Sequence, residues 1–232
     1  MSPAAGEVVI LEIPLDGDVP GDANLADNER RRLSRMRSEA KRREFIVSRD
    51  AMRRALGQLL GRSASEVAIE LGEHGKPEVC GADFHFNLSH SGDRAVLALS
   101  REGPIGIDIE AMAPRRPFAR LARRFFAASE IEWFEEYGED DRREAFYRLW
   151  TLKEAYLKAV GTGLSMSSRA FDIRVDGALG ELREVPGDLS DRGPWHLETV
   201  QLDGAYVVSI CTPVGLVSYR RVTLNELGGG SP

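Results

Sequence analysis

Hydrophobic residues recur along the chain with two spacings, one typical of strands and the other of helices. Short runs rich in β-branched and aromatic residues predict strands at 8–11, 67–71, 84–88, 95–99, 105–109, 170–175, 195–202, 205–211 and 216–222. Apolar residues at helical spacing predict long helices over 38–60 and 141–160, and shorter ones over 118–126 and 129–137. Residues 15–28 are rich in Gly, Pro, Asp and Asn and predict a loop. The pattern therefore predicts a mixed α/β fold.

The predicted elements occur twice in the same order: a strand, a long helix and then several strands. We therefore expect two similar α/β halves, residues 1–104 and 105–227, each a small sheet packed with a long helix. No internal sequence repeat is strong enough to prove a duplication. The Gly-rich residues 228–232 are expected to form a disordered tail.

Composition limits the class of protein. Hydrophobic residues make up 42% and charged residues 29% of the 232 residues, which allows a sizeable core and a soluble surface. No apolar run approaches the ~20 residues that span a bilayer, so we expect no membrane contact. Residues 8–11 are too short a run for a signal peptide. Cys80 and Cys211 lack metal-ligand spacing and suggest a reducing, cytoplasmic location.

The net charge of −6 conceals basic segments at 30–54 and 115–124 and an acidic segment at 130–144. Generalised nucleic-acid binding would favour a basic total, so no nucleic-acid partner is expected. The basic segments suggest contact with phosphates or with a small acidic partner. On charge alone, solvated helix faces explain them equally well.

The sharpest local signal is the segment 105–110, Ile-Gly-Ile-Asp-Ile-Glu. Because alternate side chains of a strand face opposite ways, the isoleucines are expected to enter the core and Asp108 and Glu110 to stand together on the other face. Gly106 leaves room beside them. Two close carboxylates repel each other unless a cation compensates, and oxygen ligands suit Mg²⁺. An amphipathic edge strand with a solvated face is the alternative.

A second signal lies on the predicted helix over 141–160. Trp150, Glu154 and Lys158 follow one another at i, i+4 and i+8, roughly opposite an apolar stripe. Glu154 is therefore a candidate third metal ligand, and Lys153 and Lys158 are candidate phosphate contacts. An ordinary surface pair of Glu154 and Lys158 explains the spacing alone as well.

A third signal is the segment 86–92, Phe-Asn-Leu-Ser-His-Ser-Gly. Its hydroxyls, backbone N–H groups and the His90 imidazole suit an anion, although a lone loop histidine is more often structural. The turn at Gly75, Lys76 and Pro77 adds a cation. A Ser-His-Asp hydrolase would need the G-x-S-x-G elbow, which is absent, as are a P-loop and G-x-G-x-x-G.

In their order and spacing these segments resemble the 4′-phosphopantetheinyl transferases of the Sfp type. The residues that carry the resemblance are Gly75-Lys76-Pro77, Asn87-Leu88-Ser89-His90-Ser91, Gly106-Ile107-Asp108-Ile109-Glu110, Trp150-Thr151-Leu152-Lys153-Glu154-Ala155-Tyr156-Leu157-Lys158 and Gly161-Thr162-Gly163-Leu164-Ser165. The resemblance covers roughly residues 41–172 and fades outside them.

The resemblance implies a pseudo-twofold monomer that binds coenzyme A between its halves. It implies that Mg²⁺, for which Mn²⁺ can substitute, is held by Asp108, Glu110 and Glu154. The 3′-phosphate and adenosine end would meet Ser89, His90, Lys76 and Pro77, and the phosphates being split would meet Lys153 and Lys158. Arg49 and Arg53 stand where such enzymes place phosphate-binding arginines.

The implied reaction moves 4′-phosphopantetheine from coenzyme A to a serine of an apo acyl or peptidyl carrier protein, releasing 3′,5′-ADP. Carriers of polyketide or nonribosomal peptide synthesis are the expected partners. Glu154, Lys158 or a metal-bound water could take the serine proton, and the sequence leaves this choice open. A coenzyme A-binding protein without transfer activity and a metal-dependent phosphohydrolase are the alternatives.

A carrier is acidic next to its serine, and Arg115, Arg116, Arg120 and Arg124 follow the candidate metal strand closely. We expect this basic segment to dock the carrier. The alternative is that it pairs with the acidic segment 130–144 of the same chain.

Overall fold

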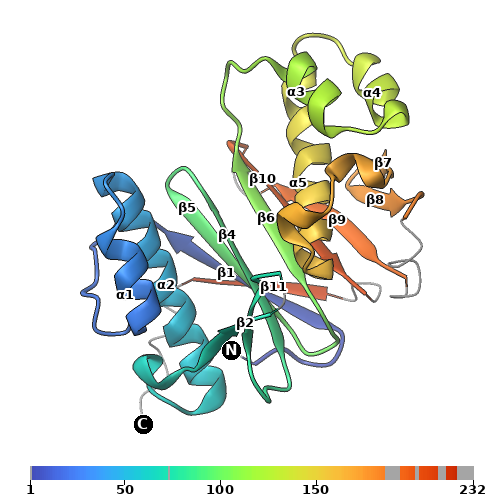
Figure 1. The fold of residues 1–232 in the computed structure, drawn as a ribbon. Coiled ribbons are helices and arrows are strands. Elements are labelled where there is room, and N and C mark those ends of the chain that lie inside the picture. Colours follow the sequence, from blue (N-terminus) through green and yellow to red (C-terminus); the bar gives the residue numbers. More distant parts are fainter. Residues whose placement is uncertain (1, 73, 186–193, 202–203, 214–217, 224–232) are drawn as a thin grey trace.

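The structure is a computed structural model that describes residues 2–72, 74–185, 194–201, 204–213 and 218–223. It is mixed α/β, as predicted, with two helix-bearing lobes on either side of packed sheets (Figure 1). The predicted tail at 228–232 lies outside the described residues. No described helix is both long and apolar enough to cross a membrane.

The first sheet has the strand order β11-β1-β5-β4. Its strands are β1 (Glu7–Pro14), β4 (His85–Ser91), β5 (Arg94–Ser100) and β11 (Ser218–Thr223). The long helix α2 (Glu39–Leu60) packs on one face through Val47, Met52 and Leu56. The Ser38 hydroxyl accepts from the Lys41 N–H and caps the helix, and Gly61, at a φ of 63°, ends it.

The second sheet has the order β6-β10-β9-β8-β7. Its strands are β6 (Gly106–Ala111), β7 (Ile173–Asp176), β8 (Leu179–Leu182), β9 (His196–Gln201) and β10 (Tyr206–Thr212). The helix α5 (Arg142–Val160) packs against it through the predicted stripe, and Leu149, Leu152 and Tyr156 are fully buried. The shorter helices α3 (Phe118–Phe125) and α4 (Ala128–Glu135) cover the start of α5 (Figure 1).

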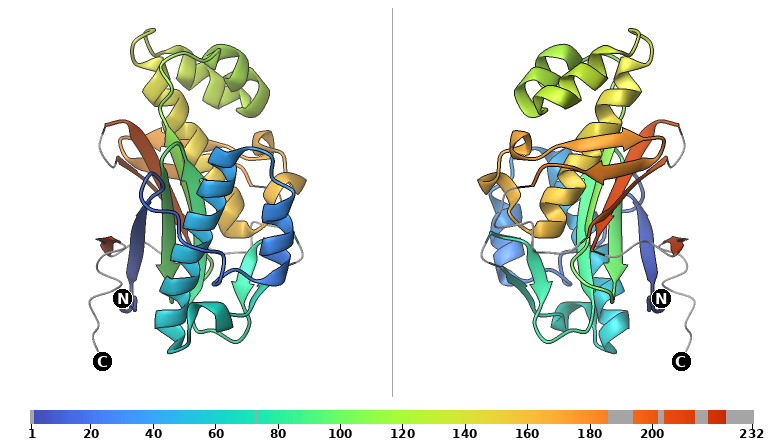
Figure 2. Two further views of the ribbon diagram at one scale, coloured as in Figure 1. Left: turned by 90° about the vertical axis from the view of Figure 1, so that its left-hand side faces the viewer. Right: turned by 90° about the vertical axis from the view of Figure 1, so that its right-hand side faces the viewer.

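The two sheets pack face to face through aliphatic side chains. Ile105, which precedes β6, and Ile107 and Ile109 of β6 bury their side chains against those of β1 and β5, as the alternation predicted. The layers are therefore α2, first sheet, second sheet and α5 (Figure 2). This arrangement leaves the other face of β6 turned toward α5.

Several elements were not predicted. Helix α1 (Asp27–Ser34) begins inside the expected loop, and β8 was missed. β2 (Ile69–Leu71) forms an antiparallel hairpin with β3 (Pro77–Val79), and 3-10 turns occupy Ala64–Glu66, Gly163–Ser165 and Ser168–Ala170.

The last strand also differs from expectation. β11, counted with the second half, pairs in parallel with β1 of the first sheet. Sequence order does not specify which sheet a final strand joins. The internal twofold relation between the halves stays a prediction.

Candidate active site

The Asp108 and Glu110 side chains leave β6 on the face opposite the buried isoleucines, as predicted. Asp108 is only 5% exposed and Glu110 is half-buried. Gly106 makes the approach of α5 to this face possible. A side chain there would overlap the carbonyl oxygen of Ala155 and come within 2.5 Å of Ala159 N. The helix therefore packs directly on the strand and presents Glu154 and Lys158 to the carboxylates.

Lys158 is the cation that sits closest to this group. Its ammonium donates to Asp108 Oδ1 at 2.6 Å, to Ser89 Oγ at 2.8 Å and to the carbonyl of Ile107 at 3.1 Å. Because an ammonium has three donors, these contacts use all of them. Lys158 thus fixes one Asp108 oxygen in place.

The other Asp108 oxygen, Oδ2, is buried and has no hydrogen-bond partner among the described residues. Burial normally requires such an atom to be paired. Glu110 accepts from Ser91 Oγ at 3.0 Å and from Trp150 Nε1 at 3.3 Å. Burial and then the charge of Asp108 raise the Glu110 pKa. The face therefore concentrates negative charge that is only partly compensated.

Glu154 completes the acidic group. Burial, followed by the charges of Asp108 and Glu110, raises its pKa, while Lys158 opposes the shift. Within the described part of the chain its carboxylate has no hydrogen bond or ion pair. The charge effects of Asp108 and Glu110 on Glu154 indicate that the three carboxylates are neighbours, and their joint binding of one metal ion stays a prediction.

The oxygen donors of these carboxylates are of the kind that a hard divalent cation prefers. Among the described residues, no three His, Cys, Asp or Glu side chains are already close enough to form a finished metal site. Asp108 Oδ2 has no partner among the described residues, and burial, followed by the charge of neighbouring carboxylates, raises the pKa values of Glu110 and Glu154. A bound cation would offset the repulsive part of these shifts. Mg²⁺ retains several waters and needs few protein ligands, so an open carboxylate group suits it.

Polar side chains of β4 hold β6 beside this site. Asn87 Oδ1 accepts from the N–H of Ile107 at 2.9 Å, Ser89 Oγ from Ile109 at 3.4 Å and Ser91 Oγ from Ala111 at 3.1 Å. These three side chains alternate along β4, so they all lie on the face that is turned toward β6. Ser91 and Trp150 were not predicted as site residues. Their spacing in the sequence could have indicated them, because Ser91 shares a strand face with Ser89 and Trp150 lies one helical turn before Glu154.

His90 leaves β4 on the opposite side and faces α1 and α2. Its Nδ1 lies 4.0 Å from a Glu44 oxygen. Burial lowers the His90 pKa, Glu44 opposes the shift, and Lys158, Arg49 and Arg32 lower it further. The Phe45 ring has Arg32 at 5.3 Å and Arg49 at 5.6 Å from its centroid. His90, Arg49 and the unpredicted Arg32 thus form one basic group.

Two predicted phosphate contacts lie elsewhere. Arg53 is 1% exposed, pairs with Glu29 at 2.7 Å and donates to the carbonyl of Val67. Lys153 is also 1% exposed, and it pairs with buried Glu130. The charge of each cation is paired inside the protein, and an unpaired buried charge would be costly. The structure does not bring either to the acidic group.

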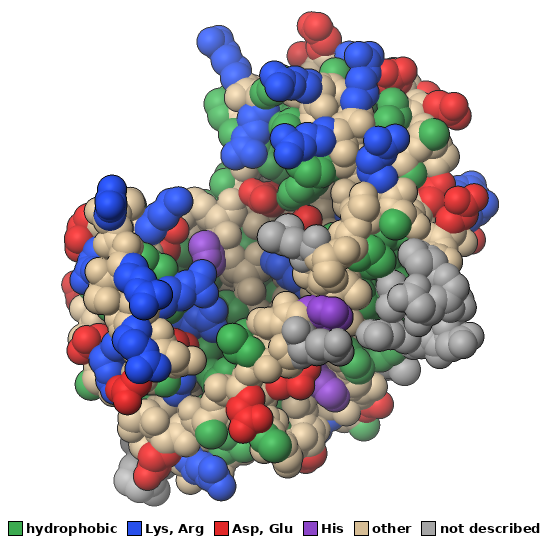
Figure 3. Space-filling view, viewed as in Figure 1, with side chains coloured by type: hydrophobic (Ala, Val, Ile, Leu, Met, Phe, Trp, Pro, Cys, Tyr) green, Lys and Arg blue, Asp and Glu red, His purple; other side chains and the backbone are tan. Residues whose placement is uncertain are grey.

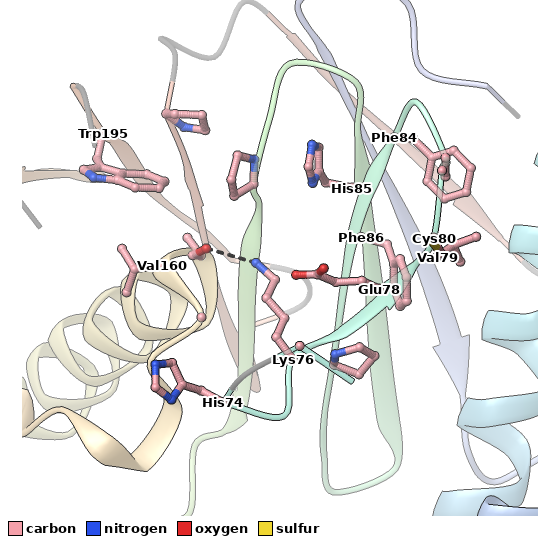
Figure 4. A pocket seen from close by; sticks show the side chains of 18 residues that line it. His74, Lys76, Glu78, Val79, Cys80, Phe84, His85, Phe86, Val160 and Trp195 are labelled. Carbon is pink, nitrogen blue, oxygen red and sulfur yellow. Dashed lines mark hydrogen bonds between the residues drawn. The ribbon is translucent and has the colours of Figure 1, made fainter. Parts of the chain in front are cut away.

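The Lys76 side chain points toward backbone carbonyls of the protein. Its ammonium donates to the carbonyls of Ile105 and Ala159, at 3.0 Å each, and Pro77 starts β3 beside it. It lies in a 770 Å³ cavity, shown in Figure 4, with the side chains of His74, Glu78 and Trp195 around it. The predicted contact of this turn with coenzyme A stays a prediction.

The basic segment after β6 forms an exposed arginine surface around α3. Arg115, Arg116, Arg120 and Arg123 line a 1040 Å³ groove. Only Arg123 pairs with the acidic segment among the described residues, at 3.5 Å from Glu135. Figure 3 shows Lys and Arg gathered on both lobes, with a hollow between them. The surface is therefore largely available to a partner.

Comparison with known proteins agrees with this geometry. The family model of the 4′-phosphopantetheinyl transferase superfamily matches residues 104–211, and that of the 4′-phosphopantetheinyl transferase N-terminal region matches residues 22–102. The chain is 33% identical over 222 residues to the 4′-phosphopantetheinyl transferase Sfp of Bacillus subtilis, which covers 87% of this chain and 96% of that protein. It is 36% identical over 168 residues to the 4′-phosphopantetheinyl transferase HetI of Nostoc, covering 68% and 70% respectively.

A holo-(acyl-carrier-protein) synthase of Bacillus anthracis, solved in complex with CoA, is similar over 47% of this chain and 92% of its own, at 23% identity and a TM-score of 0.39. The resemblance read from the sequence segments is confirmed by the relatives that match most of the chain. Strand β6 with its two carboxylates, helix α5 with Glu154 and Lys158, and strand β4 with His90 thus occur in a chain that belongs to the 4′-phosphopantetheinyl transferase superfamily.

Proposed function

We propose that this protein transfers 4′-phosphopantetheine from coenzyme A to a serine of an apo carrier protein and releases 3′,5′-ADP. The serine oxygen forms a bond to the β-phosphorus, and the bond from that phosphorus to the bridging oxygen breaks. The observation that carries the proposal is the buried, unpartnered Asp108 Oδ2 beside two carboxylates whose pKa values are raised. Basic groups on both lobes support a phosphate-rich substrate.

Asp108, Glu110 and Glu154 would hold Mg²⁺, or Mn²⁺ in its place. The ion would supply charge stabilisation at the phosphate oxygens. Lys158 holds Asp108 Oδ1 and Ser91 holds Glu110, so the chain preorganises two of the three ligands. A preorganised donor group stabilises developing charge without having to reorganise during the reaction.

Glu154 is the residue we propose as the base for the serine proton. Lys158 donates three hydrogen bonds and has no lone pair to offer while it remains an ammonium. The Glu154 carboxylate has no such partners among the described residues, and its raised pKa suits proton transfer. It can act directly or through a bound water. Lys158 would then serve as the anchor of Asp108.

The 3′-phosphate end of coenzyme A would bind at His90, Arg49 and Arg32, with Ser89 on the same strand. The support is electrostatic, since burial lowers the pKa of His90 and of Arg49, and the charge of Arg32 lowers both further. A dianionic phosphate would relieve that repulsion. Arg53 and Lys153 are left out of this site because their charges are already paired.

The carrier would dock on the arginine surface around α3, at Arg115, Arg116, Arg120 and Arg124. Arg115 and Arg120 are exposed and have no ion pair among the described residues. A helix that is acidic beside its serine complements such a surface and would be steered to it. We further propose a polyketide or nonribosomal peptide carrier, a cytoplasmic location and a monomeric enzyme.

One experiment separates this proposal from its alternatives. The protein is incubated with Mg²⁺, coenzyme A and an apo carrier, and the carrier is weighed by mass spectrometry. Transfer adds one phosphopantetheine to the serine and yields 3′,5′-ADP. A coenzyme A-binding protein without activity leaves the carrier unchanged. A phosphohydrolase consumes coenzyme A without modifying the carrier. Parallel reactions with peptidyl and fatty-acid carriers test the partner class.

A further inference from the structure

The strand β6 pairs with β10 on one edge only. Along its other edge, three N–H groups bond to side chains of β4, those of Asn87, Ser89 and Ser91. The carbonyl of Ile105, just before the strand, accepts from Lys76, and that of Ile107 in the strand accepts from Lys158. Unpaired edge groups must find partners when they are buried. In the described part of β6, side chains fill the place of a neighbouring strand.

Lys76 reaches this edge from the turn between β2 and β3. Its stem passes Gly161, where an added Cβ would lie 3.5 Å from Lys76 Cδ. Its Nζ then donates to the carbonyl of Ile105 and to that of Ala159 in the last turn of α5. Figure 4 shows the side chain extended across the cavity toward the end of that helix. A cation suits this position because the last carbonyls of a helix carry partial negative charge.

The two lysines join the same helix to the same strand. Lys76 joins Ala159 to Ile105, and Lys158 itself reaches Ile107. Between them, Gly106 allows the backbones of helix and strand to touch. A helix in such close contact can slide or tilt only if these hydrogen bonds break. Glu154 lies one turn earlier on that helix, so its place relative to Asp108 depends on the same contacts.

We infer that Lys76 is a positioning residue: by bridging Ile105 and Ala159 it locks the end of α5 to β6 and so sets Glu154 and Lys158 against Asp108. The inference rests on the proposed function for its kinetic consequences. It gives Lys76 a role different from that of a phosphate contact, because two of its three donors are committed to carbonyls.

The test compares Lys76→Met and Lys76→Arg with wild type, using coenzyme A and dephospho-coenzyme A well below the melting temperature. For Lys76→Met we expect kcat to fall about tenfold or more, because small misplacements of reacting groups are costly. KM should change little, and the loss should be equal with both substrates. Lys76→Arg, which retains the donors, should recover part of kcat. Lys41→Met, at an exposed position, controls for loss of a lysine and should leave the melting temperature unchanged.

A second measurement does not depend on activity. Amide hydrogen exchange in the last turn of α5, around 157–161, should be faster in Lys76→Met than in wild type. Unchanged exchange there would overturn the inference, even if wild type proves to have no transferase activity. A raised KM for coenzyme A with normal kcat, absent with dephospho-coenzyme A, would also overturn it and make Lys76 a ligand of the 3′-phosphate.

Discussion

Lys158 and Asp108 form a hydrogen-bonded ion pair of 2.6 Å that joins α5 to β6 and leaves the second Asp108 oxygen without a partner. Lys158→Met removes the cation and leaves a buried carboxylate uncompensated. We expect the free energy of unfolding to fall by about 1–3 kcal/mol. In an Asp108→Asn background the same change should cost much less. Urea unfolding of the four proteins of this double-mutant cycle measures the coupling, and additive losses would show that the pair is not coupled.

Gly106 is where α5 and β6 touch, so Gly106→Ala must push them apart. We expect unfolding free energy to fall by about 1–3 kcal/mol, as overpacking does. Transfer should fall by about a hundredfold, because Glu154 and Lys158 move away from Asp108. Gly138→Ala is the matched control, since a Cβ there meets no atom within 4 Å. Normal kinetics for Gly106→Ala would contradict the close contact.

His90 belongs to the basic group that is separate from the carboxylates. If it binds the 3′-phosphate, its contacts aid binding more than chemistry. His90→Ala should therefore raise the KM for coenzyme A more than it lowers kcat. The effect should largely vanish with dephospho-coenzyme A, and Arg32→Ala should behave in the same way. Steady-state kinetics with coenzyme A and with dephospho-coenzyme A test this prediction. Equal losses of kcat/KM with both would show that His90 does not bind the 3′-phosphate.

The arginines around α3 are proposed to meet the carrier. Arg120→Glu and Arg124→Glu should each raise the KM for the carrier several-fold and flatten its salt dependence, because exposed charges mainly steer encounter and are screened by salt. The KM for coenzyme A should hardly move. Arg62→Glu, exposed at the end of α2, reverses a charge away from α3 and should have no effect. Wild-type carrier kinetics in both α3 variants at low salt would rule out this docking surface.

Periodicity predicted those parts of the site whose geometry is local. The alternation at 105–110 separates the isoleucines from Asp108 and Glu110, and the helical spacing brings Trp150, Glu154 and Lys158 to one side, as the structure confirms. Both depend only on the pitch of a single element. The same alternation places Ser89 and Ser91 on one face of β4, where both contact β6.

Long cationic side chains were not predictable in this way, because their partners are distant in the sequence. Lys153 pairs with Glu130, 23 residues away, and lies next to Glu154 but about 100° around the helix from it. Lys76 reaches carbonyls 29 and 83 residues away. Arg53 is held by Glu29 of an unpredicted helix. The residue type in a motif therefore indicates which acceptors a cation can bind, and the fold determines which of them it contacts.

The central claim is that the acidic group supports phosphopantetheine transfer to a carrier serine. Replacing any one of Asp108, Glu110 and Glu154 by Ala removes a proposed metal ligand and should reduce transfer by orders of magnitude. The fold should survive, since removing one carboxylate also relieves repulsion among the three. Circular dichroism and thermal melts of each variant provide the control.

The most direct measurement is the intact mass of an apo carrier after incubation with coenzyme A. With wild-type protein and Mg²⁺ we predict complete conversion to the phosphopantetheinylated form. EDTA should abolish conversion, and Mg²⁺ or Mn²⁺ in excess should restore it. The Glu154→Ala protein, although folded, should leave the carrier unmodified over the same period. Conversion at near wild-type rates by Glu154→Ala, or by wild type in excess EDTA, would contradict the account.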